Sequence, residues 1–166
     1  MFDWEADARR FHIHADRYLQ AAKFILHENG PADSMIAPCC QNIGLSLELF
    51  LKARALEARI PRKEVRALGH KLILMWYKPW AAEARLVAER AAAAHMDKIF
   101  IRPGEPRLVD LRPAKEELMR ELEWLDAGYT NETEYALRYP RDETTTVPSP
   151  EFLIPVLDQL IDAFYK

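Results

Sequence analysis

The chain has 166 residues, of which 49% are hydrophobic and 30% are charged, and its net charge is −3. This composition excludes a disordered tail, and the length suffices to bury a core without disulfides or metals. The longest strongly apolar run covers only residues 72–77, and residues 1–5 lack signal-peptide character, so we expect one cytoplasmic domain over 1–166 with no membrane association.

The first part of the chain is predicted to form two long helices. Apolar residues recur at helical spacing from Phe11 to Ile25, and Gly30 followed by proline ends this stripe. A second apolar stripe predicts a helix that begins near Pro38, an acceptable first-turn residue, and ends before Pro61.

Shorter elements are expected next. A helical turn should cover 62–67, with Gly69 as its cap, and an apolar segment follows over 72–77. The alanine-rich stretch 81–98 predicts another main helix. Its alanines either allow close approach of a further helix, in this chain or in a second subunit, or simply favour helix formation.

The second half is predicted to add two more main helices, over 113–127 and 150–165. Apolar residues around a Pro-Gly break could form short strands near 99–109, and the segment 128–150 is the least regular. The sequence therefore predicts an all-α fold, an up-and-down bundle of about five main helices with short strands possible near 99–109.

The histidines and cysteines predict neither a metal site nor a cofactor. His12 and His14 lie about 200° apart around a helix, and no histidine pair has the spacing of a helical metal site. Cys39 and Cys40 are adjacent, which disfavours a disulfide between them. We expect them to be reduced, small residues in or near the core.

Positive charge is concentrated between residues 52 and 71. This stretch contains seven lysines and arginines and two glutamates, so its net charge is +5, whereas the net charge of the whole chain is −3. The basic residues are Lys52, Arg54, Arg59, Arg62, Lys63, Arg66 and Lys71. This asymmetry is compatible with an anionic partner, and equally with a solvated helix end and loop.

Glu48, Lys52 and His70 allow two interpretations. Glu48 and Lys52 have the i, i+4 spacing of a helix-surface ion pair, or they form a polar pair at a groove edge that reaches toward the Gly69–His70 turn. His70 is either a packing or capping residue, or a group that titrates near neutrality and donates to phosphate.

Two sets of residues resemble the motifs of HEPN domains. One set resembles the signature of the second helix of these domains together with their G-H-x-L turn. The other set resembles an R-Y-P element that precedes the last helix. The first set is Ser46, Glu48, Leu51, Lys52 and Ala53 with Gly69, His70 and Leu72, and the second is Leu137, Arg138, Tyr139 and Pro140. The resemblance covers residues 10–80 well and 115–165 loosely.

This resemblance implies a helical bundle of four to five helices, commonly homodimeric, that binds RNA or nucleotides. Some members are RNA-cutting toxins paired with a small nucleotidyltransferase, and others bind without catalysis. Cutting members carry an R-x(4–6)-H motif on a late helix. Arg90 and His95 match its letters, as do Arg9 and His14 on the first helix, about as many matches as chance predicts.

The leading hypothesis is therefore a non-catalytic, homodimeric module that binds RNA, a nucleotide or a partner protein, such as one of the nucleotidyltransferase type, through the surface of residues 48–71. One alternative is a metal-independent endoribonuclease that uses Arg90 and His95, and another is a purely structural interaction protein. The candidate binding residues are Glu48, Lys52, Arg62, Arg66, His70 and Arg138.

Overall fold

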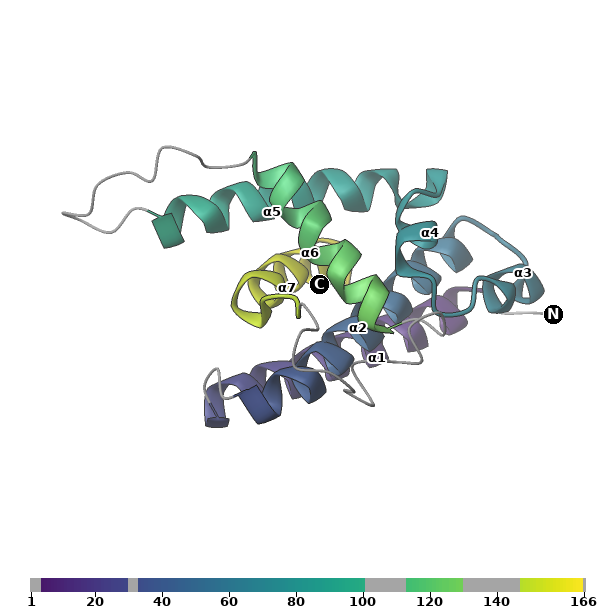
Figure 1. The fold of residues 1–166 in the computed structure, drawn as a ribbon. Helices are drawn as coiled ribbons and strands as arrows, with labels where there is room; N and C mark the ends of the chain where they lie inside the picture. The colour runs from purple at the N-terminus through teal and green to yellow at the C-terminus, as the bar shows by residue number, and fades with distance from the viewer. Residues whose placement is uncertain (1–3, 30–32, 101–112, 130–146, 166) are drawn as a thin grey trace.

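The computed structural model describes residues 4–29, 33–100, 113–129 and 147–165, and within these ranges every regular element is a helix (Figure 1). The all-α prediction is confirmed. The elements are α1 (Trp4–Asn29), α2 (Asp33–Glu57), α3 (Arg62–Ala67), α4 (Leu72–Trp76), the 3-10 turn η1 (Pro79–Ala81), α5 (Ala82–Phe100), α6 (Ala114–Tyr129) and α7 (Pro150–Tyr165). No helix in these ranges is long and apolar enough to cross a membrane.

The two longest helices, α1 and α2, lie side by side as an antiparallel pair (Figure 1). With 26 and 25 residues, each is roughly 38 Å long. Their facing stripes are fully buried, including Leu19 on α1 and Leu47 and Phe50 on α2. Ser46 on α2 adds a polar contact, because its hydroxyl donates to the carbonyl oxygen of Ala15 at 2.8 Å.

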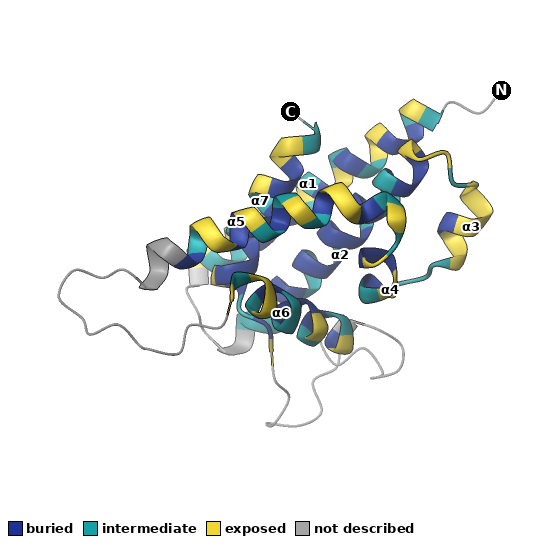
Figure 2. Ribbon diagram, turned by 90° about the horizontal axis from the view of Figure 1, so that it is seen from above, coloured by how far each residue is buried: buried dark blue, intermediate teal, exposed yellow. Residues whose placement is uncertain are grey.

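The helix α7 completes the core, because it contacts α1, α2 and α5. Figure 2 shows buried residues along α7 interspersed with exposed ones. Those buried residues are Pro150, Phe152, Leu153, Ile154, Val156, Leu157, Leu160 and Ile161. On α5, the alanines at 84, 88, 91 and 92 are buried, and α5 packs against α7 and α6 of the same chain.

Two boundary predictions are wrong. The helix α2 begins at Asp33 instead of near Pro38, because a proline this close to the N-terminus removes only one intrahelical hydrogen bond, to the carbonyl of residue 34. The strand expected near 99–109 is contradicted at 99 and 100, where α5 continues to Phe100. An established helix extends at little cost, whereas a short strand needs a pairing partner. Residues 101–109 lie outside the described ranges.

The segment between α2 and α5 forms the end of the bundle nearest the N-terminus of α1 (Figure 1). Only one residue of α3, Val65, is buried, and it packs with Ala8 of α1 and Leu56 of α2. Gly69 has a φ of +61°, a left-handed conformation that glycine adopts without strain. This conformation turns the chain from α3 into α4, and it places His70 at the turn.

Candidate functional site

The structure brings Glu48, Lys52 and His70 together. One carboxylate oxygen of Glu48 accepts a hydrogen bond from Lys52 Nζ at 2.6 Å, and the other accepts one from His70 Nδ1 at 2.8 Å. Glu48 is only 4% exposed. The pair of Glu48 and Lys52 therefore reaches toward the Gly69–His70 turn, as the second interpretation predicted.

Burial gives these three residues different roles. A carboxylate as buried as Glu48 must be paired, because its unpaired charge would cost several kcal/mol of desolvation. Glu48 thus anchors Lys52 and His70, whose side chains are 13% and 43% exposed. His70 is the member of this cluster that a ligand can reach most easily.

Asp126, which no sequence motif singles out, stabilises the start of α4. Asp126 on α6 accepts hydrogen bonds through Oδ1 from the backbone N–H groups of Leu72, at 2.6 Å, and Ile73, at 3.3 Å. Lys71, the residue before α4, makes no side-chain cap. Asp126 therefore supplies the cap from another helix, which holds the Gly69–His70 turn against α6.

The basic residues of the connector point largely outward. Lys63, Arg66 and Lys71 are exposed. Arg62 forms an ion pair with Asp7 of α1, and its side chain remains 45% exposed. We define the α3 surface as Arg62, Lys63, Arg66, His70 and Lys71.

The two candidate catalytic residues lie on α5 and face different directions. Arg90 and His95 are five residues apart, about 140° around the helix. Arg90 is exposed, whereas His95 Nε2–H donates to the carbonyl oxygen of Glu151 at 3.0 Å and its ring lies 6.0 Å from that of Phe152. His95 thus links α5 to the start of α7. Arg138 lies outside the described ranges.

Both cysteines are buried, unbridged core residues, as the sequence predicted. Burial raises the pKa of Cys39 to about 11, with a smaller contribution from the charge of Glu151. Burial also raises the pKa of Cys40. In the described part of the chain, no three His, Cys, Asp or Glu side chains are arranged to hold a metal ion.

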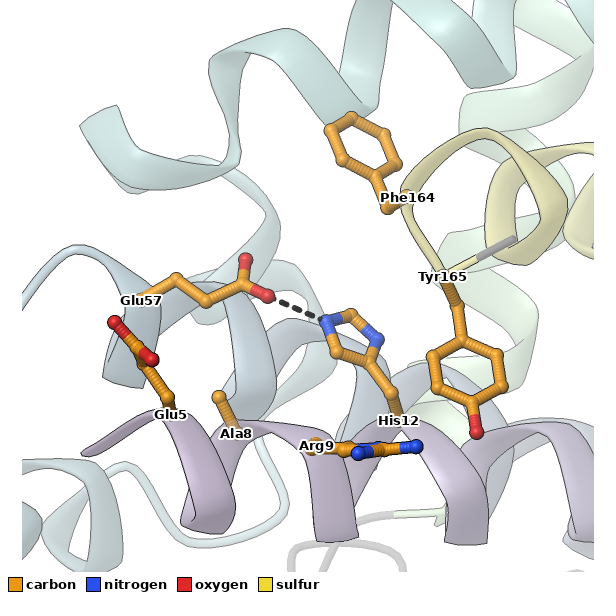
Figure 3. A pocket seen from close by; sticks show the side chains of 7 residues that line it. All are labelled: Glu5, Ala8, Arg9, His12, Glu57, Phe164 and Tyr165. Carbon is orange, nitrogen blue, oxygen red and sulfur yellow. Dashed lines mark hydrogen bonds and ion pairs between the residues drawn. The ribbon is translucent and has the colours of Figure 1, made fainter. Parts of the chain in front are cut away.

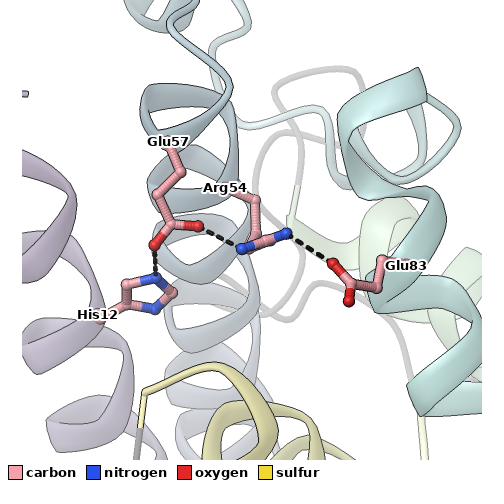
Figure 4. A network of polar contacts seen from close by, with 4 residues as sticks. All are labelled: His12, Arg54, Glu57 and Glu83. Atoms are coloured by element: carbon pink, nitrogen blue, oxygen red, sulfur yellow. Dashed lines mark hydrogen bonds and ion pairs between the residues drawn. The ribbon is translucent and has the colours of Figure 1, made fainter. Parts of the chain in front are cut away.

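A chain of polar contacts that the sequence did not reveal joins α1, α2 and α5 (Figure 4). His12 Nε2 lies 2.8 Å from one carboxylate oxygen of Glu57, and the other oxygen accepts a hydrogen bond from Arg54. Arg54 also donates to Glu83 at 3.1 Å, and its guanidinium lies 4.2 Å from the centre of the Phe164 ring. Both oxygens of Glu57 are therefore engaged.

The electrostatics of this chain favour an ionised Glu57. Burial alone would raise the pKa of Glu57, but the hydrogen bond and charge of His12, together with Arg54, outweigh that effect and lower it. Beside this pair lies a pocket of about 500 Å³, lined by residues of α1, by Glu57 and by the aromatic end of α7 (Figure 3). From the sequence, His12 was considered only as a metal ligand, and its spacing from His14 excluded that role.

No family model, curated protein or solved structure matches the chain.

Proposed function

We propose that the chain is a HEPN-like, homodimeric helical module that binds RNA through the α3 surface without cutting it. The order of the sequence motifs supports this proposal, and so does the all-α bundle in which they occur. Within that bundle Glu48, Lys52 and His70, which belong to the resemblance, are in contact with one another.

The observation that carries the proposal is the placement of α3. Val65 is the one buried residue of this helix and Arg62 pairs with Asp7 of α1, so most of the remaining surface of α3 faces solvent. Lys63 and Arg66 lie three residues apart, on neighbouring turns of that exposed surface. Cations at this spacing suit successive phosphates of a flexible single strand better than a compact ligand, which would need an enclosing pocket.

The total charge of the chain supports a local mode of binding. Because the protein as a whole carries a net charge of −3, general attraction to a polyanion is weak. Binding would therefore depend on the α3 surface, with His70 held in position by Glu48. Because His70 Nδ1–H donates to Glu48, it is the cationic form of His70 that can donate Nε2–H to a phosphate oxygen.

The first prediction tests this surface by charge reversal. Lys63→Glu and Arg66→Glu are each expected to weaken binding of a fluorescently labelled single-stranded RNA several-fold, measured by anisotropy. Each should also reduce the slope of log K against log salt by about 0.7 for the lost phosphate contact. Both side chains are exposed, so the fold should persist, which circular dichroism checks.

The matched control is Lys115→Glu, which makes the same change of charge at a side chain 68% exposed on α6. Its affinity for RNA should stay close to that of the wild type. Equal weakening in all three variants would mean that only net charge matters, and absence of wild-type binding would refute the proposal. Shortening of the RNA in a metal chelator, abolished by His95→Ala, would instead support the nuclease alternative.

A further inference from the structure

The pocket beside His12 is an open depression whose volume suits a small molecule. Its volume of about 500 Å³ lies within the range typical of ligand pockets. Glu5, Arg9 and His12 project from one face of α1, because their positions fall within about 60° around the helix. Phe164 and Tyr165 close the pocket from α7.

His12 supplies the polar group that points to a ligand. Its side chain is 3% exposed, and its Nδ1 has no hydrogen-bond partner among the described residues. In Figure 3 this nitrogen lies on the side of the ring away from Glu57, toward Tyr165. A buried polar atom without a partner costs about 1–3 kcal/mol, which a bound ligand would recover.

Glu57 determines what His12 can offer to that ligand. Because the ionised carboxylate accepts a hydrogen bond from Nε2–H, the neutral ring carries its lone pair on Nδ1. We assign this neutral form to His12 in the complex with the ligand, where Nδ1 accepts a hydrogen bond from an N–H or O–H group. Each carboxylate oxygen of Glu57 already accepts one hydrogen bond, from His12 or from Arg54, while the side chain also lines the pocket.

The other lining residues define the rest of the ligand. The rings of His12 and Tyr165 are stacked, with 5.8 Å between their centres and 22° between their planes. Phe164 is held by Arg54 and by an edge contact with Phe50. Tyr165, in the last turn of α7, thus forms the aromatic wall against which a flat ring can lie.

Arg9 and Glu5 supply charge at the mouth of the pocket. Both are exposed, and within the described ranges neither forms an ion pair. Arg9 can hold an anionic group through two parallel hydrogen bonds, and Glu5 can accept from a further N–H group. One cation and one carboxylate at the same opening favour a ligand that carries both an anion and a donor.

We propose that this pocket binds a small molecule with an aromatic ring, an N–H donor and an anionic group. The ring lies against Tyr165, the donor reaches Nδ1 of His12, and the anionic group binds Arg9. This proposal does not rest on RNA binding, because no residue of the α3 surface lines the pocket, although Ala8 of the lining packs against Val65 of α3.

Two probes distinguish the possible anionic groups. Adenosine monophosphate combines an aromatic amine with phosphate, and 4-aminobenzoate combines one with a carboxylate. Binding of either is expected to shift the ¹⁵N resonance of His12 Nδ1 in an NMR titration, since this nitrogen gains a hydrogen bond. The probe with the higher affinity identifies the group that Arg9 prefers.

The test variant is Arg9→Gln, and the matched control is Arg10→Gln, an exposed neighbour about 100° around α1. Arg9→Gln should weaken binding about tenfold, as expected for the loss of a charge-assisted hydrogen bond, while Arg10→Gln should leave it unchanged. The proposal is overturned if neither probe shifts the His12 resonance at millimolar concentration. It is equally overturned if the two variants bind a probe equally well.

Discussion

Three buried or half-buried glutamates illustrate how individual residues are stabilised in this protein. Glu48 is paired with Lys52 and His70, and Glu57 with His12 and Arg54. Glu121, by contrast, is 3% exposed, and although Arg120 and the backbone N–H of Ser149 contact it, burial dominates and raises its pKa. The folded protein therefore favours the ionised form of Glu57 and disfavours the ionised form of Glu121.

Replacing Glu48 tests the most deeply buried ion pair of the cluster. Glu48→Gln removes the charge that compensates Lys52 and His70, so we expect the free energy of unfolding to fall by about 3 kcal/mol. Urea denaturation followed by circular dichroism measures this change. The control is Glu64→Gln, an exposed glutamate on α3, which should change the free energy by less than about 0.5 kcal/mol. Equal stability of both variants would show that the pairing contributes nothing.

The raised pKa of Glu121 predicts a dependence of stability on pH. Its pKa in the folded protein lies above the ordinary value of 4.5, so the folded state binds more protons than the unfolded state in that interval. Stability contributed by this group is therefore greatest below pH 4.5, and it is lost as pH rises through the folded pKa. Glu121→Gln, whose amide oxygen can still accept from Ser149, should remove this loss.

Thermal melts across the pH range check that prediction. The difference in Tm between Glu121→Gln and the wild type should grow in favour of the variant as pH rises from 4.5 toward neutrality. Glu123→Gln changes an exposed carboxylate on the same helix, and its difference from the wild type should not depend on pH in this way. A constant difference for Glu121→Gln would contradict the assignment.

At the scale of elements, the features that could be predicted were those marked by residues close to them in the sequence. The bounds of α3, the end of α1 near Gly30 and the start of α7 at Pro150 follow from turn residues and helical spacing. The contacts of Asp126 with α4 and of His12 with Glu57 could not be predicted, because they join residues 54 and 45 positions apart. Packing of the helices brings such pairs together, and a single sequence carries no sign of it.

The cap of α4 provides a test at this scale. Five residues are too few for a stable helix without tertiary support, so α4 depends on Asp126. Asp126→Ala should reduce the free energy of unfolding by about 1 kcal/mol and accelerate amide hydrogen exchange at Leu72 and Ile73. Glu123→Ala, on the exposed face of α6, should do neither. Unchanged exchange at both amides would exclude the capping role.

At the scale of the whole molecule, one large apolar cluster draws on every long helix, and the two cysteine thiols lie inside it. Cys39 and Cys40 are 1% and 0% exposed, and their raised pKa values keep them protonated. A thiol reagent needs both access and a thiolate. Thiol reactivity in this protein should therefore report opening of the core.

We expect both thiols to react with Ellman's reagent only very slowly in the native protein, and rapidly in urea. The dependence of the reaction rate on urea should follow the global unfolding transition. An Ala93→Cys variant, which places a thiol at an exposed position of α5, should release one equivalent immediately under native conditions. Immediate reaction of the wild type would mean that the core opens locally around α2.

The position of α7 in the chain has a consequence for synthesis on the ribosome. Neighbouring helices α1 and α2 can pair as soon as both have emerged, yet α7, which covers part of that pair, follows 92 residues after the end of α2. At usual rates of translation this interval lasts roughly 5–20 s. Throughout it the nascent α1–α2 hairpin exposes apolar surface that only α7 will cover, and this makes the unfinished chain a natural client for chaperones.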